Sequence, residues 1–194
     1  MKFKGRCEYG HIRYEKTRSL LVVLLTIALG LAVFALGLLL NKGDKKNIFS
    51  VIAMLFVIPM SLRLVRLIVL LPFHTPNRDI YERVQASLGP EDLLFSDFVF
   101  TNGQNAFGLS FLALCGSNLY GFFEISKDKK GKEKAAKAQF YFKDTFQRRG
   151  MQIKQCCICT EEKDFLKKIK ECDKTPLAEE DKKAVREFLI SLAV

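Results

Sequence analysis

The chain has 194 residues and a formal net charge of +10, from 31 Lys and Arg against 21 Asp and Glu. Residues 1–73 hold 11 of the basic residues and three acids, whereas residues 74–194 hold 20 basic residues and 18 acids. Because the excess positive charge lies in the N-terminal part, a nucleic-acid-binding protein is not the favoured interpretation.

Leu20–Leu40 is an uncharged stretch of 21 residues, ten of them leucine. At about 1.5 Å per residue a helix of this length covers roughly 31 Å, the thickness of the hydrocarbon core of a bilayer. A cleavable signal peptide is the alternative, but its apolar region is shorter, about 7–15 residues, and ends at small residues. Here Asn41-Lys42-Gly43-Asp44 follows, so we predict an uncleaved transmembrane helix.

A second apolar stretch, Ile48–Phe73, predicts a second span. Pro59 is expected to kink this helix, because its ring removes one backbone hydrogen bond. Arg63 and Arg66 interrupt the stretch and share one helix face. Neither apolar stretch contains an acid that could pair with them, so we interpret both arginines as snorkelling to the lipid phosphates. An intramembrane functional site is the alternative.

Basic residues are more frequent outside the two stretches than between them. Six precede the first span and four end or follow the second, whereas three lie in the short connection. Because cytoplasmic segments carry the excess of Lys and Arg, we expect both termini in the cytoplasm. The expected organisation is a cytoplasmic basic segment over residues 1–19, a transmembrane hairpin over 20–73 (spans 20–40 and 48–66, interfacial segment 67–73), and a soluble domain over 74–194.

Hydrophobic periodicity in the soluble part predicts an α+β domain with the order helix, three strands, helix, strand and two helices. Asn102-Gly103 and Gly116-Ser117-Asn118 mark tight turns between the first three strands. The expected fold is a small mixed sheet with helices on at least one face, an α/β sandwich. The predicted ranges are helix 76–88, strands 93–101, 106–115 and 119–125, helix 133–149, strand 151–160, a helix over 161–172 capped by Thr160, and a helix from 176 through 192.

The order helix, three strands, helix, strand resembles that of restriction-endonuclease-like domains. This resemblance implies a catalytic acid on the second strand and Glu-x-Lys on the third, which together bind a metal ion and activate water. Here the third strand ends in Glu124-Ile125-Ser126-Lys127, the second strand has no acid, and Asp97 lies one strand too early. The sequence therefore predicts no active nuclease and leaves an inactive relative of that fold as an alternative.

The chain has six cysteines, which are Cys7, Cys115, Cys156, Cys157, Cys159 and Cys172. In a cytoplasmic domain they are expected to be reduced. Cys156 and Cys159 have the spacing of zinc ligands, but no second pair exists, and His11 and His74 lie beside the spans. We therefore interpret the cysteines as small buried hydrophobes, with a metal or redox site as the alternative. No catalytic residue, cofactor or metal ligand is predicted.

The lysine-rich segment 127–137 is interpreted first as a solvated loop and the start of a helix. Anionic lipid headgroups are the alternative partner, because each basic residue near such a surface contributes about 1 kcal/mol. Nucleic-acid binding is disfavoured, because Phe140, Tyr141 and Phe142 follow the lysines and are expected in the core. The candidate membrane-surface contacts are Arg63, Arg66, Lys127, Lys129, Lys130, Lys132, Lys134 and Lys137.

The first 80 residues resemble uncharacterised two-span membrane proteins of low-GC Gram-positive anaerobic bacteria. The similarity rests on Tyr14-x-Lys16-x-Arg18 before the first span, and on Asn-Ile-Phe-Ser and Pro-Phe-His-x-Pro at the two ends of the second. It implies a bacterial inner-membrane location and brings no activity, ligand or fold with it.

We therefore expect a non-enzymatic, membrane-anchored cytoplasmic domain that binds a ligand or a protein partner in addition to the lipid bilayer. The alternative is a degenerate restriction-endonuclease-like domain, or another metal-dependent hydrolytic domain, tethered to the membrane.

Overall fold

The computed structural model describes residues 5, 7–40, 48–103, 105–123, 129–172 and 176–193, with the backbone alone for residues 129 and 130. The chain divides into two compact units. The helical unit is Ile12–Pro72, and the sheet unit is Met1–His11 together with Phe73–Val194. The two ends of the chain therefore fold into the same unit.

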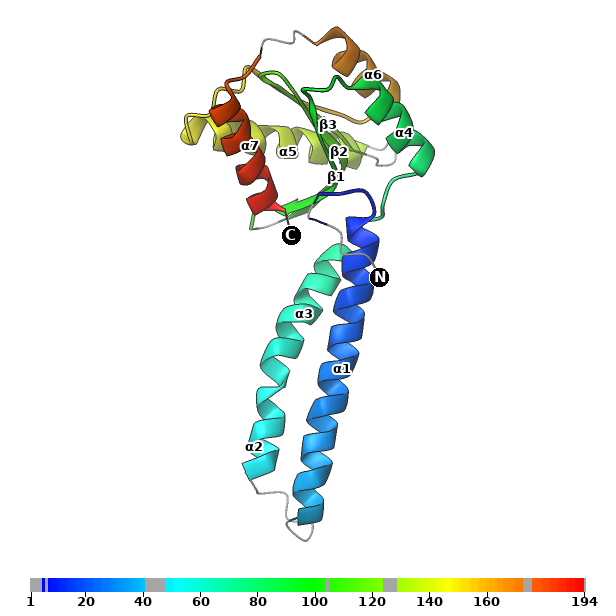
Figure 1. Ribbon diagram of the computed structural model, residues 1–194, viewed down its shortest axis with the longest axis vertical. Helices are drawn as coiled ribbons and strands as arrows, with labels where there is room; N and C mark the ends of the chain where they lie inside the picture. The colour runs from blue at the N-terminus through cyan, green and yellow to red at the C-terminus, as the bar shows by residue number, and fades with distance from the viewer. Residues whose placement is uncertain are drawn as a thin grey trace. The chain divides into compact units, whose positions relative to one another are not determined.

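Two long apolar helical runs make up the helical unit (Figure 1). α1 (His11–Leu40) is a single helix of 30 residues, while α2 (Ile48–Leu55) and α3 (Val57–Leu70) form the second run. Both runs are long and apolar enough to cross a membrane. α1 begins well before the apolar stretch that starts at Leu20, because the polar residues ahead of it continue the same helix.

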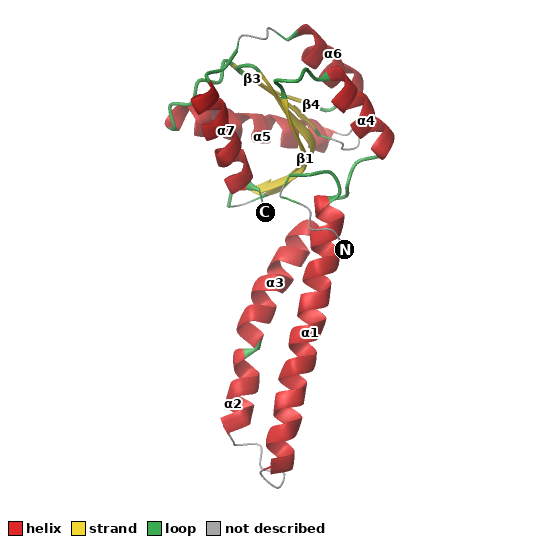
Figure 2. Cartoon of the chain, viewed as in Figure 1, coloured by secondary structure: helices red, strands yellow, loops and turns green. Residues whose placement is uncertain are grey.

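The second run is interrupted at Phe56, where the coil between α2 and α3 shows in green in Figure 2. Pro59 has no backbone N–H and so leaves the carbonyl of Leu55, four residues earlier, without its helical donor. The Phe56 N–H bonds instead to the Ala53 carbonyl at 3.2 Å, in the tighter three-residue pattern. The interruption therefore lies where the proline is expected to distort the helix.

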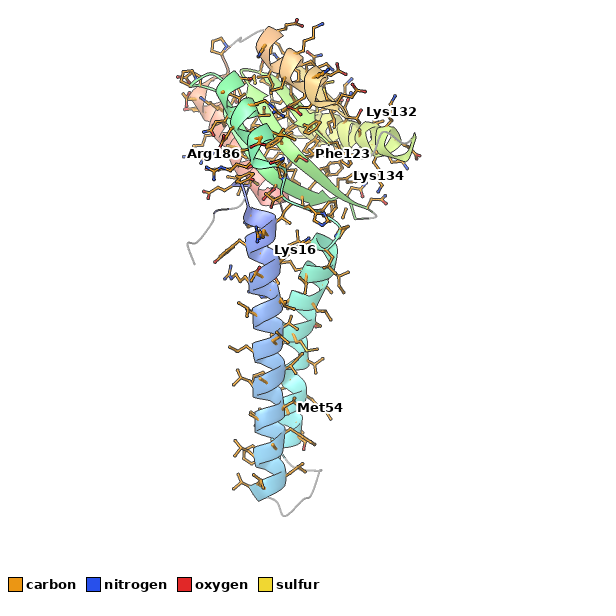
Figure 3. The ribbon with its side chains drawn as sticks, turned by 90° about the vertical axis from the view of Figure 1, so that its right-hand side faces the viewer. Lys16, Met54, Phe123, Lys132, Lys134 and Arg186 are labelled. Atoms are coloured by element: carbon orange, nitrogen blue, oxygen red, sulfur yellow. The ribbon has the colours of Figure 1, made fainter. Side chains whose placement is uncertain are left out.

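Small and polar residues of α1 face the second run. A Cβ placed on Gly30 would lie 3.5 Å from the Cβ of Phe56, so the two backbones approach closely there. Ser19 and Thr26 are also buried. The large apolar side chains point outward: Met54, labelled in Figure 3, is 70% exposed. The helical unit thus buries several polar residues and exposes most of its leucines, although Ile12, Val23 and Leu70 are buried.

The sheet unit contains four strands in the order β1-β2-β3-β4. β1 (Leu93–Thr101), β2 (Ala106–Cys115) and β3 (Asn118–Phe122) pair antiparallel, and β4 (Gln155–Cys159) is parallel to β3 at the edge. The sheet is therefore mixed, as predicted. Its helices are α4 (Arg78–Ser87), α5 (Lys129–Arg148), α6 (Glu162–Glu171) and α7 (Glu179–Leu192).

The helices cover both faces of the sheet (Figures 1 and 2). α5 and α7 cover one face, where Phe142 and Phe188 pack among residues such as Phe100 of β1. α4 and α6 cover the other, where Val84 and Phe165 join a second core cluster. Each face has its own apolar core, so the sheet unit can exclude water on both sides.

The segment that enters the sheet unit from Phe73 is packed against β1 and β2. A Cβ on Gly108 would overlap the ring of Phe73, so only glycine leaves room for this ring. Thr75 donates a hydrogen bond to Asp97 at 3.1 Å, and the carbonyl of Pro76 accepts one from Tyr9. The segment 73–77 is thus fixed to the sheet by side-chain contacts.

Several element ends differ from those predicted. α5 begins at Lys129 rather than at Glu133, because the lysines before Glu133 are good helix formers. α7 begins only at Glu179, beyond Pro176. The N-cap of α6 is Glu161, not Thr160, and its side chain makes no capping hydrogen bond.

Candidate functional site

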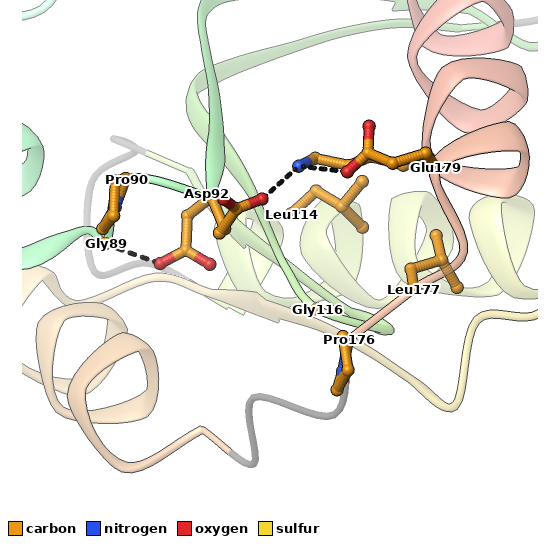
Figure 4. Close-up of a pocket in the computed structure, with 10 residues that line it drawn as sticks. Gly89, Pro90, Asp92, Leu114, Gly116, Pro176, Leu177 and Glu179 are labelled. Atoms are coloured by element: carbon orange, nitrogen blue, oxygen red, sulfur yellow. Dashed lines mark hydrogen bonds and ion pairs between the residues drawn. The ribbon is translucent and has the colours of Figure 1, made fainter.

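A cavity of about 260 Å³ opens where three distant segments of the sheet unit meet (Figure 4). The segments are the turn after α4, the turn between β2 and β3, and the start of α7. Leu114 and Leu177 supply apolar walls, and Gly116 leaves the turn side open. The remaining lining residues are Gly89, Pro90, Glu91, Asp92, Pro176, Glu179 and Lys182.

One lysine bridges the rim of this cavity. The ammonium of Lys182 lies 3.1 Å from a carboxylate oxygen of Glu91 and 3.3 Å from one of Glu179 (Figure 4). The hydrogen bond that Lys182 donates to Glu91 raises the pKa of Lys182. Asp92 accepts a hydrogen bond from the Gly89 N–H at 2.7 Å, which closes the neighbouring turn. The rim therefore carries three carboxylates and one ammonium over an apolar floor, a setting suited to a small, largely apolar ligand with a cationic group.

The lysine-rich part of α5 is the second candidate. Lys132 and Lys134 are exposed and project from the helix in Figure 3, and Lys137 is exposed beside Glu133 at 2.7 Å. Of the other candidate contacts, Lys127 lies outside the described residues, and Lys129 and Lys130 are described by their backbone alone. Lys134 and Lys137 thus lie in the helix predicted for them, and Lys132, predicted in the preceding loop, also belongs to α5.

Phe140 does not lie in the core, contrary to the expectation from the sequence. It is 72% exposed, whereas Phe142, two residues later, is fully buried. The buried face of α5 follows the helical period through Ala138 and Phe142, and Phe140 falls outside that face. A shallow hollow around Phe140 is also lined by Lys137 and Tyr141. Among the described residues of the sheet unit, Phe140 is the one large hydrophobic side chain that is exposed.

Arg63 and Arg66 have an acidic partner that the sequence analysis missed. Glu15 of α1 is buried, and its carboxylate lies 3.3 Å from Arg66 and 3.9 Å from Arg63. Arg18, one turn further along α1, lies 3.8 Å from the other carboxylate oxygen. The interpretation of two arginines without an acid was therefore wrong. Glu15 precedes the apolar stretch, so a search for acids within the stretches did not find it.

The cysteines are reduced in the structure and differ in burial. Cys7, Cys115 and Cys159 are buried, whereas the remaining three are partly covered. Burial raises the pKa of Cys156 to about 12, and burial also raises the pKa of Cys159 to about 11. The interpretation as small core residues holds for the buried three. Cys157 differs, because its sulfur contacts a lysine.

The acids required for nuclease chemistry are not brought together in the described part of the chain. Asp97 is buried on β1 and accepts a hydrogen bond from Thr75, while Glu124 lies outside the described residues. Among those residues, no group of three or more His, Cys, Asp or Glu side chains could hold a metal ion. We therefore build no metal-dependent mechanism on these positions.

No protein-family model matches this chain, and comparisons with curated proteins and with solved structures find no significant similarity.

Proposed function

We propose that this protein is a non-enzymatic, membrane-anchored binding domain. The helical unit spans a bacterial inner membrane as a hairpin, both termini lie in the cytoplasm, and the sheet unit contacts the anionic membrane surface through α5. We assign ligand binding by the sheet unit to the cavity between Leu114 and Leu177.

The exposed side chains of the helical unit support the membrane anchor. Large apolar residues such as Leu25 (62%), Leu39 (79%) and Ile48 (71%) are exposed along both runs. In water such a surface would be strongly unfavourable, at about 25 cal/mol per Å² of apolar area. A core helix of a soluble protein would bury this surface, so hydrocarbon is the solvent that fits these side chains.

The position of the charged residues supports the orientation. The 30 residues of α1 span about 45 Å, which exceeds the roughly 30 Å hydrocarbon core. With Leu20–Leu40 in the hydrocarbon, Glu15 and its arginines lie at headgroup depth, where long basic side chains are accommodated. The end of the helical unit that carries Arg18, Arg63 and Arg66 is then the cytoplasmic end.

The surface contact is inferred mainly from Phe140, whose ring is exposed beside lysines of α5. An exposed aromatic ring costs free energy in water and gains it at the lipid interface, where aromatic side chains are enriched. Lys132, Lys134 and Lys137 would add about 1 kcal/mol each near an anionic surface. Because the sheet unit is tethered to the bilayer, this contact forms at a high effective concentration.

Fluorescence can test the surface contact, because the chain contains no tryptophan. Phe140→Trp in the full-length protein, reconstituted into nanodiscs, introduces a single reporter at the predicted contact. We expect blue-shifted emission and quenching by spin-labelled lipid in anionic discs, and neither effect in zwitterionic discs. Raising the salt to about 0.5 M should reverse both effects, because the Debye length falls well below 10 Å.

Lys167→Trp is the matched control, since Lys167 is an exposed residue of α6 on the other side of the sheet. Its emission should be the same in both kinds of disc. Replacing Lys132 and Lys134 by glutamate should abolish the response of the Phe140→Trp reporter. Identical Phe140→Trp spectra in anionic and zwitterionic discs would refute the surface contact.

A further inference from the structure

Three arginines of the helical unit surround one buried carboxylate. Glu15 is 2% exposed, and its Oε1 atom lies 3.3 Å from Arg66 and 3.9 Å from Arg63. Its Oε2 atom lies 3.8 Å from Arg18 on the same helix. Among the described residues, no other acid lies within ion-pair distance of these arginines. The group therefore holds three positive charges and one negative charge, a net charge of +2.

Several hydrogen-bonding atoms of this group lack partners within the described part of the chain. The Nε atom of Arg66 is buried without an acceptor, and Oε1 of Glu15 accepts no hydrogen bond, so the ion pairs leave guanidinium donors unused. Ser19, one turn after Glu15, is fully buried, and its hydroxyl also has no partner there. Buried polar atoms are nearly always satisfied by a protein group, a ligand or an ordered water. The unused donors and the net charge together indicate an anionic ligand.

The basic side chains come from two helices that are joined at one end of the helical unit. Arg63 and Arg66 lie three residues apart and share one face of α3. Lys16, labelled in Figure 3, donates a hydrogen bond to the carbonyl of Leu71 at 2.9 Å and so ties α1 to the residue that follows α3. Glu15 orients the guanidinium groups and Lys16 fixes the helix ends, so binding a ligand costs less side-chain freedom.

Large apolar side chains adjoin the arginines of α3. Leu62, which precedes Arg66 by one turn on the same face, is 70% exposed, and Val65 is 60% exposed. A ligand that fits both parts has an anionic head and an apolar body. Guanidinium groups bind phosphate through paired hydrogen bonds, and basic pockets between transmembrane helices on the cytoplasmic side bind anionic lipid headgroups. These features favour a phospholipid over a free anion.

We propose that Arg18, Arg63 and Arg66 bind the headgroup phosphate of one phospholipid, and that the site prefers a phosphomonoester, as in phosphatidic acid, over a phosphodiester, as in phosphatidylglycerol. A phosphomonoester carries about −1.5 to −2 charges at pH 7, which balances the net charge of the group, whereas a phosphodiester carries a single charge. The inference rests on the proposed membrane anchor, which puts these residues at headgroup depth.

This site differs from the proposed surface contact of α5. The lysines of α5 are exposed, so salt screens their attraction to lipid, whereas partly buried charges are screened much less. The side chains of Arg63 and Arg66 are 36% and 26% exposed, and the carboxylate that orients them is buried. We therefore expect the lipid preference to persist at about 0.5 M salt, where the α5 contact is lost.

Quenching by brominated lipid tests the preference in the full-length protein. Leu62→Trp places a single tryptophan near Arg66, because the natural chain contains none. The protein is reconstituted into phosphatidylcholine bilayers with a small fraction of brominated phosphatidic acid, phosphatidylglycerol or phosphatidylcholine, at about 0.5 M salt. We expect phosphatidic acid to quench at an about tenfold lower mole fraction than phosphatidylglycerol, because the second charge strengthens its attraction to the site.

Arg66→Gln in this background should abolish the preference, and Arg63→Gln replaces it if circular dichroism shows that the first variant is unfolded. Arg66→Lys keeps the charge without the planar fork and should restore the preference only in part. Arg13→Gln is the matched control, since it removes an exposed positive charge of α1 outside the group and should change nothing. Replacing Lys132 and Lys134 by glutamate should also leave the preference unchanged, so a failure of the α5 contact is distinguished from a failure of this site.

A second reporter, Leu39→Trp at the far end of α1, should be quenched equally by all three lipids. Excess inorganic phosphate should leave the quenching of the Leu62→Trp reporter unchanged, whereas loss of the preference in phosphate would show that the site takes the free anion. Equal quenching by phosphatidic acid and phosphatidylglycerol, or a preference that survives both arginine variants, would overturn the site and leave the anchor intact. No quenching by any of the three lipids would contradict the membrane anchor and this proposal with it.

Discussion

The helical unit and the sheet unit differ in which large apolar residues they bury: most are exposed in the helical unit and nearly all are covered in the sheet unit. In the helical unit the buried set includes Glu15, Ser19 and Thr26, while the leucines of α1 and the isoleucines of the second run are exposed. In the sheet unit the buried set is dominated by phenylalanine and leucine, and Phe140 is the exposed exception among the described residues.

This contrast is what the proposed membrane anchor predicts. A unit folded in water gains free energy by burying apolar side chains, whereas helices in hydrocarbon gain little from doing so and associate through small residues and polar contacts. Gly30 against Phe56 and Glu15 against Arg66 are contacts of the second kind. The same chain therefore follows two sets of packing rules, divided near Ile12 and again near Pro72.

The largest expected effect is a difference in the loss of stability between one substitution in each unit. Phe142→Ala in α5 removes a fully buried ring and should lower the unfolding free energy of the sheet unit by about 3–5 kcal/mol. Leu25→Ala in α1 removes an exposed side chain and should cost less than about 1 kcal/mol in a bilayer. Pulse proteolysis of the full-length protein in nanodiscs measures both. Equal losses for the two variants would contradict the division into two solvents.

The second effect concerns the polar contacts inside the helical unit. Glu15→Gln leaves Arg63 and Arg66 without a negative partner and should destabilise the pairing of the helices by about 2 kcal/mol, since breaking a buried pair is costly even when the partners are partly exposed. Titration with a denaturing detergent measures this loss. Glu82→Gln, which breaks the exposed pair with Arg78, is the control and should cost less than about 0.5 kcal/mol. A smaller loss for Glu15→Gln than for the control would mean that the buried carboxylate does not hold the helices.

A third effect tests where the chain enters the sheet unit. Gly108→Ala places a methyl group against the ring of Phe73 and should cost about 1–2 kcal/mol through overpacking. Phe73→Ala should relieve part of this cost in the double variant, as a double-mutant cycle would show. Additive losses would indicate that Phe73 does not rest on Gly108.

The last effect is a pH dependence of the sheet unit, which is small near pH 9 and grows as the pH rises. Burial raises the pKa of Cys156 from the ordinary thiol value of about 9 to about 12, so between these values the unfolded chain loses the thiol proton while the folded chain keeps it. The unfolding free energy should therefore fall as the pH rises above about 9. In Cys156→Ala this part of the decline should be absent. An equally steep decline in that variant would assign the effect to other groups.

The bounds of two strands were predictable from the sequence. β1 and β2 have the ranges predicted for them, because strong turn signals at Asn102-Gly103 and at Gly116 limit their ends. The exposure of Phe140 could also have been predicted: it lies two residues from Phe142, off the buried face of the same helix. That error came from treating three aromatic residues as one group.

Contacts between distant segments were not predictable in the same way. The contact of Lys168 with Cys157 depends on how α6 crosses β4, and the cavity beside Leu114 depends on three turns that meet only in the folded sheet unit. Glu15 is an intermediate case. The four-residue spacing predicts that Glu15 and Ser19 lie on one face of a helix, but the pairing of Glu15 with Arg66 depends on how two helices pack. Local periodicity carries no information on such packing.

We propose that the helical unit crosses the membrane twice and leaves both ends of the chain in the cytoplasm. Reporter fusions test it most directly: green fluorescent protein and alkaline phosphatase are each attached after Val194 and, separately, inserted between Gly43 and Asp44. We expect fluorescence without phosphatase activity at Val194, and phosphatase activity without fluorescence at the insertion. Phosphatase activity at Val194 would contradict the topology, and fluorescence at both sites would contradict the membrane crossing itself.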